Sequence, residues 1–90
     1  MNNEKVNKVL AGYVQQLCEF GYDATPVRHD LSGPDGGAAA EHALWMCEEA
    51  LTWGPERLEK KFRWLGFIQG VLWMTHGCTI RELKKDNKEG

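Results

Sequence analysis

Residues 63–73, RWLGFIQGVLW, would form a helix that is apolar on nearly every side. A helix on the surface of a small globular protein needs only one apolar stripe, which faces the core. The heptad-like spacing of three and four residues predicts one such stripe. It consists of Phe62, Leu65, Gln69, Leu72 and His76. A second stripe lies opposite, and it must face either another part of the chain or another molecule.

This second stripe combines glycines with large apolar side chains. Each glycine inside a helix costs about 1 kcal/mol relative to alanine, so two at a spacing of four indicate the close approach of another backbone. Two interpretations stay open. This helix is either central, with a helix on each side, or it meets another chain, most simply in a two-fold dimer. The dimer interpretation predicts an interface formed by Trp45, Gly66, Phe67, Gly70, Trp73 and Met74.

The rest of the chain indicates an all-α fold of about four helices in a single domain over residues 1–90. Residues 4–20 and 38–53 each carry one apolar stripe, a long helix is expected over 55–76, and a short one follows 79. The short WGPE link predicts a central αα-hairpin between the second and third helices. Asn2 or Asn3 is expected to cap the first helix, with Gly21 just past its end. Residues 21–37 form a long loop, and 85–90 a frayed tail.

The composition points to the cytoplasm. No apolar run approaches the roughly 18 residues of a membrane span, and the start, MNNEKVNK, lacks the apolar segment of a signal peptide. Three widely spaced cysteines without a CxxC pair do not predict a disulfide framework. Free thiols are commonly buried, and we expect burial of Cys18 and Cys47.

Candidate residues for catalysis or metal binding are few. His42, Cys47, His76 and Cys78 are all zinc-ligand types, but their spacing matches no zinc motif. Cys78 near His76 is the only local pair of a thiol and an imidazole. The chain contains no GxxxxGK[ST], GxGxxG or HExxH. We therefore predict no enzyme activity, no metal and no cofactor.

Charge is distributed unevenly along the chain. Residues 1–56 hold three Lys or Arg and nine Asp or Glu, whereas residues 57–90 hold eight and four. The two halves either complement each other or attract a charged partner. Partner contact is predicted for the loop residues Arg28, His29 and Asp30 and for the basic segment Arg57, Lys60, Lys61 and Arg63. The alternative function is binding of nucleic acid or a nucleotide through this basic segment, against which stands the pI of 5.9.

The segment HALWMCEEALTW…EKKFRWLGFIQGVLWMTHGCTIRELKKDN resembles a pattern found in small accessory proteins of tailed bacteriophages. The resemblance covers residues 42–87 and carries no active site. It implies a protein made in the cytoplasm of an infected bacterium. Such proteins commonly bind and inhibit or redirect a host enzyme or defence complex. The sequence thus predicts a homodimeric binding protein with a host protein as a further partner and no membrane association.

Overall fold

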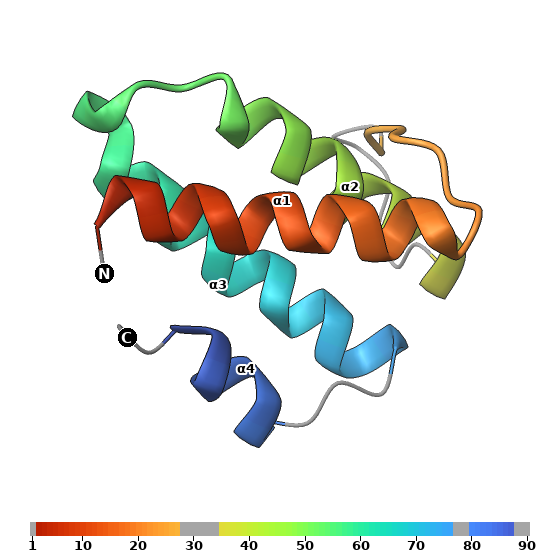
Figure 1. Ribbon diagram of the computed structural model, residues 1–90. Coiled ribbons are helices and arrows are strands. Elements are labelled where there is room, and N and C mark those ends of the chain that lie inside the picture. The colour runs from red at the N-terminus through yellow and green to blue at the C-terminus, as the bar shows by residue number, and fades with distance from the viewer. Residues whose placement is uncertain (1, 28–34, 77–79, 88–90) are drawn as a thin grey trace.

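The protein is all-helical in the computed structural model, which describes residues 2–27, 35–76 and 80–87 (Figure 1). No strand occurs within these ranges, as the sequence predicts. The helices are α1 (Asn3–Glu19), α2 (Gly36–Leu51), the short 3₁₀ helix η1 (Pro55–Arg57), α3 (Leu58–Thr75) and α4 (Ile80–Asn87).

The three long helices surround one core. Figure 1 shows α2 and α3 with a similar inclination, α1 running across both, and α4 below α1 and beside α3. Small residues of α2, including Ala40, Ala43 and Ala50, are fully buried and let the neighbouring helices pack closely. The buried apolar side chains are Val6, Leu10, Tyr13, Leu17, Ala40, Ala43, Leu44, Met46, Cys47, Ala50, Leu65, Ile68 and Leu72.

Local chemistry sets the ends of the helices. The Asn2 side chain accepts a hydrogen bond from the Lys5 amide at 2.9 Å, and Asp35 accepts one from the Ala38 amide at 2.7 Å. Both are N-caps, which satisfy amides that have no partner within the helix. Gly21 follows α1 with φ of 92°, a conformation that side chains with a Cβ rarely adopt. Pro55 occupies the first position of η1.

Several sequence expectations are corrected. The periodicity places Phe20 on the apolar stripe of residues 4–20 and Phe62 on the first stripe of α3, yet both are exposed. Cys18 is exposed where the sequence predicts burial. Each lies beside the buried stripe of its helix, where periodicity alone cannot fix the edge of the contact. The last turn of α4 reaches Asn87, so the predicted tail from 85 begins as ordered helix. The sequence TIRE at 79–82 also predicts Thr79 as the N-cap of the last helix, and this residue lies outside the described residues.

Cys47 is the thiol that the core does enclose. It is fully buried in α2. Burial, with a smaller contribution from the charge of Glu48, raises the pKa of Cys47 to about 12. The thiol therefore stays protonated near neutral pH, and a role as nucleophile or metal ligand is disfavoured.

Candidate protein interaction surface

The first stripe of α3 faces the core, as predicted for three of its five positions. Leu65 and Leu72 are buried, together with Ile68 beside them. Gln69 is also buried, and its amide donates to the Tyr13 hydroxyl at 3.0 Å and to Asn87 Oδ1 at 2.7 Å. Asn87 returns a hydrogen bond to Gln69 Oε1 at 3.0 Å. The polar position in the stripe thus joins α3 to α1 and α4.

His76 closes this stripe at the end of α3. Its ring lies 5.0 Å from the Phe20 ring and 5.3 Å from the Tyr22 ring, centroid to centroid. These contacts attach the segment after α1 to the C-terminal end of α3. The His76 ring thus packs as part of an aromatic cluster.

The second stripe is open to solvent. We call Gly66, Phe67, Gly70, Trp73 and Met74 the outer face of α3. Phe67 is 55%, Trp73 50% and Met74 75% exposed. Isolated exposed apolar residues are ordinary on protein surfaces, whereas three large ones grouped on a single helix face are typical of an interaction site. The interpretation in which α3 is enclosed on both sides is therefore wrong for these residues.

A groove runs along this face. Its volume is about 640 Å³, and its lining comes from the start of α2 and the second half of α3. The lining residues are Gly36, Ala39, Phe67, Gly70, Val71, Trp73, Met74 and Thr75. Sequence reasoning missed Gly36, Ala39, Val71 and Thr75, because only the packing of α2 against α3 brings them together. The one available signal was the run of small residues at the start of α2.

The glycines of the outer face have no packing role inside this chain. A Cβ added at Gly66 or at Gly70 would have no atom within 4 Å outside its own helical turn. Neither position requires a conformation that only glycine adopts, since both lie within α3. Their cost of about 1 kcal/mol each relative to alanine is therefore not offset by any close contact within the protein.

Trp45 lies at the edge of the outer face of α3 and is partly covered by the protein. It is half-buried against the core, and its ring lies 5.7 Å from His42 and 6.1 Å from Trp64. His42 also contacts Phe67, ring to ring at 6.4 Å. The predicted interface residue Trp45 is thus linked to the outer face through His42, which the sequence did not assign to this surface.

The ring contacts of Trp45 and Trp64 continue to Trp53, whose ring lies close to two basic side chains. Trp64 meets Trp53 with a centroid separation of 4.6 Å. The Arg57 guanidinium lies 5.0 Å and the Lys60 ammonium 4.9 Å from the Trp53 ring. These cation–π contacts give the two basic residues a packing role in addition to any role in binding a partner.

Lys61 corrects the predicted basic surface. Its side chain is fully buried, and its ammonium donates to Asn3 Oδ1 at 2.7 Å and to Asn7 Oδ1 at 3.0 Å. Burial lowers the pKa of Lys61, while the charge of Glu56 opposes that shift. Lys61 therefore joins α3 to α1 and is not available to a partner, whereas Arg57 and Arg63 remain exposed.

The other predicted partner residues, Arg28, His29 and Asp30, lie outside the described residues, as does Cys78. Within residues 2–27, 35–76 and 80–87, no group of three His, Cys, Asp or Glu side chains could hold a metal ion. In the same part of the chain, no helix combines the length and the apolar character needed to cross a membrane.

Comparison with protein-family models, with curated proteins and with solved structures gave no match. The proposal of a function therefore rests on the geometry and the sequence of the chain itself.

Proposed function

We propose that this protein acts by protein–protein binding through the outer face of α3, and that its first partner is a second copy of itself. One observation carries the proposal: Gly70 lines a groove beside the exposed Phe67 and Trp73, and among the described residues nothing approaches the position of a Cβ at Gly70 or at the neighbouring Gly66. A helix of a partner could approach α3 closely there. Tryptophan is among the residues that contribute most to binding at interfaces.

A two-fold dimer suits a helical face of this kind. In such a dimer the same surface is used by both copies, so the Gly66–Gly70 stretch of one α3 would lie against that of the other. The exposed Phe67, Trp73 and Met74 would then leave water on both sides of the contact. Burial of apolar area contributes about 25 cal/mol per Å² before the costs of association.

The wider role that we propose rests on the resemblance of residues 42–87 to bacteriophage accessory proteins. In that role the dimer binds a host protein or defence complex in the bacterial cytoplasm and inhibits or redirects it, and no catalytic step is assigned. For the second partner we propose the exposed Arg57 and Arg63. The sequence adds Arg28, His29 and Asp30 as further candidates, and these lie outside the described residues.

Two substitutions at Gly70 test the self-association. Gly70→Leu fills the groove, and we expect it to weaken the dimer at least about tenfold, equivalent to about 1.4 kcal/mol. Gly70→Ala adds a Cβ that meets nothing in the monomer, and we expect it to stabilise the monomer by about 0.5–1 kcal/mol while weakening the dimer. Light scattering behind a sizing column and sedimentation equilibrium measure the association, and urea unfolding at low concentration measures the stability.

Matched controls separate a docking surface from general effects. Ala11→Leu places the same side chain at an exposed site of α1, and Gly12→Ala gives the same helix stabilisation away from the outer face. Neither is expected to change the association. A wild-type chain that stays monomeric up to several hundred micromolar, or equal effects of Gly12→Ala and Gly70→Ala on a dimer, would contradict the proposal.

A further inference from the structure

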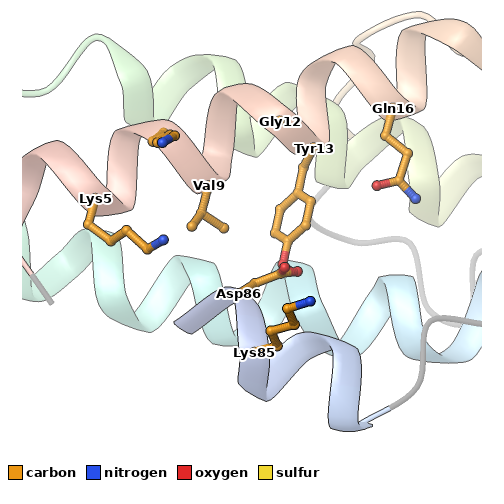
Figure 2. Close-up of a pocket in the computed structure, with 8 residues that line it drawn as sticks. Lys5, Val9, Gly12, Tyr13, Gln16, Lys85 and Asp86 are labelled. Atoms are coloured by element: carbon orange, nitrogen blue, oxygen red, sulfur yellow. The ribbon is translucent and has the colours of Figure 1, made fainter. Parts of the chain in front are cut away.

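A second hollow lies between α1 and α4, away from the outer face of α3 (Figure 2). It is open to solvent, and its volume is about 410 Å³. Figure 2 shows Lys5, Val9 and Tyr13 projecting from α1 toward α4, with Lys85 and Asp86 on the opposite side. The spacing of three and four residues along α1 puts these lining positions on one face of the helix. The lining residues are Lys5, Lys8, Val9, Gly12, Tyr13, Gln16, Lys85 and Asp86.

The hollow has a surplus of positive charge. Lys5, Lys8 and Lys85 line it against a single carboxylate, Asp86. In the described part of the chain, no hydrogen bond or ion pair engages any of the three ammonium groups. Asp86 already accepts a hydrogen bond from the Tyr13 hydroxyl at 2.8 Å. Three cations from two helices therefore line the hollow, and none is neutralised by an ion pair.

Gly12 lines the hollow on the α1 side and has no side chain to fill it. It lies in the middle of α1, and an added Cβ would have no neighbouring atom within 4 Å. Alanine would favour the helix by about 1 kcal/mol, so packing within this chain does not explain the glycine. Its effect is to leave the floor of the hollow open between Lys8 and Gln16, whose side chains border it.

We propose that this hollow is a binding site for a ligand that carries a chain of two or three phosphate groups. Lysine ammonium groups are compact charges that bind phosphate oxygens, and three of them offset most of the negative charge of such a chain. The floor at Gly12 lets the phosphates reach the α1 surface. A free polyphosphate and a nucleotide share this chemistry. The site is independent of the proposed function, since none of its residues belongs to the outer face of α3.

Calorimetric titration with inorganic tripolyphosphate and, separately, with ATP tests the site at low ionic strength. We expect Lys85→Gln and Lys8→Gln each to weaken binding about tenfold, the usual loss on removing a charged contact. Lys84→Gln is the matched control: it removes the same charge from the adjacent exposed residue of α4, which does not line this hollow, and should change binding less than about twofold.

Two further variants distinguish a built site from diffuse attraction. Asp86→Asn keeps an oxygen to accept the Tyr13 hydroxyl but removes the negative charge, so we expect tighter binding, which damage to the fold would not produce. Gly12→Leu should block the floor, whereas Ala11→Leu should not. Far-UV circular dichroism checks that each variant remains folded.

The two probes also identify the source of the phosphates. Equal affinity for tripolyphosphate and ATP assigns the site to the phosphate chain alone, and tighter binding of ATP assigns it to a nucleotide whose base contacts the protein. Equal losses for Lys84→Gln and Lys85→Gln, or no binding of either probe to the wild-type protein at millimolar concentration, would overturn the proposal.

Discussion

Replacing Lys61 with Ala is expected to lower the free energy of unfolding by about 2–4 kcal/mol, the range for truncating a long buried side chain. The aliphatic part of Lys61 is enclosed by the protein, and its ammonium holds Asn3 and Asn7 of α1. Truncation leaves a cavity and removes both hydrogen bonds. Urea unfolding followed by tryptophan fluorescence measures the loss.

Lys61→Met is the control that keeps the volume. It removes the buried charge along with its hydrogen bonds. Because Asn3 and Asn7 are only partly buried, water can take the place of the lost donor, so we expect a change within about 1 kcal/mol. Lys60 is less buried than Lys61, so Lys60→Ala should lower the free energy of unfolding much less than Lys61→Ala. Equal destabilisation by Lys61→Ala and Lys61→Met would show that the hydrogen bonds, rather than the packing, dominate.

The difference in stability between the wild-type protein and Lys61→Met should depend on pH, and the direction of this dependence follows from the pKa of Lys61. Because burial lowers the pKa of Lys61 below 10.5, the cost of holding its charge in the fold is present in full below the lowered value. Between the lowered value and 10.5 the unfolded chain binds more protons than the folded one. The wild-type protein should therefore gain stability relative to Lys61→Met as the pH rises through this alkaline range. A constant difference would contradict the assignment.

Ile68→Ala is the second substitution with a large expected effect, a loss of about 2–5 kcal/mol in the free energy of unfolding. Ile68 is completely buried, whereas its neighbour Phe67 is 55% exposed. Phe67→Ala removes a larger side chain, yet at concentrations where the protein is monomeric we expect its effect to stay near the ±0.5 kcal/mol usual for surface sites. Denaturation of the two variants at low micromolar concentration makes the comparison.

The comparison of Phe67→Ala with Ile68→Ala also tests whether the protein forms a dimer. If the outer face binds a second copy, the cost of Phe67→Ala should grow with protein concentration, because unfolding of a dimer is linked to dissociation. The cost of Ile68→Ala should be large at every concentration. A large loss for Phe67→Ala in the dilute monomer would mean that its ring packs within the chain and would exclude the outer face as a free surface.

Much of the helical architecture was predictable because periodicity reports the local preference of each segment. Of the predicted stripe Val6, Leu10, Tyr13, Val14, Leu17 and Phe20, four residues are buried, Val14 is partly buried and Phe20 is exposed. Asn2 and Gly21 delimit α1 through side-chain capping and backbone conformation. Both effects act over a few residues, so the sequence contains the information. The second stripe of α3 could be recognised in the same way. The sequence could not show whether this second stripe faced the core or solvent.

The candidate sites depend on long-range contacts that periodicity does not encode. The sequence placed Lys61 among exposed basic residues, and only the approach of α1 reveals that Asn3 and Asn7 bind it. The hollow between α1 and α4 likewise joins Lys5 to Lys85, which are separated by most of the chain. Neither pairing follows from any spacing along the sequence.

By itself, the sequence determined the approximate course of the helices, the cap of α1 and the existence of two apolar faces on α3, because hydrophobic spacing and backbone preference act locally. It did not determine the start of α2, since Asp35 and Gly36 lie in the segment predicted as a loop. Tertiary structure decided which face was left uncovered. The buried stripe of α3 packs into the core with α1 and α2, while Phe67, Trp73 and Met74 stay in solvent. That outcome depends on how the side chains of α1, α2 and α3 pack together, and the hydrophobic pattern along the sequence cannot specify this packing.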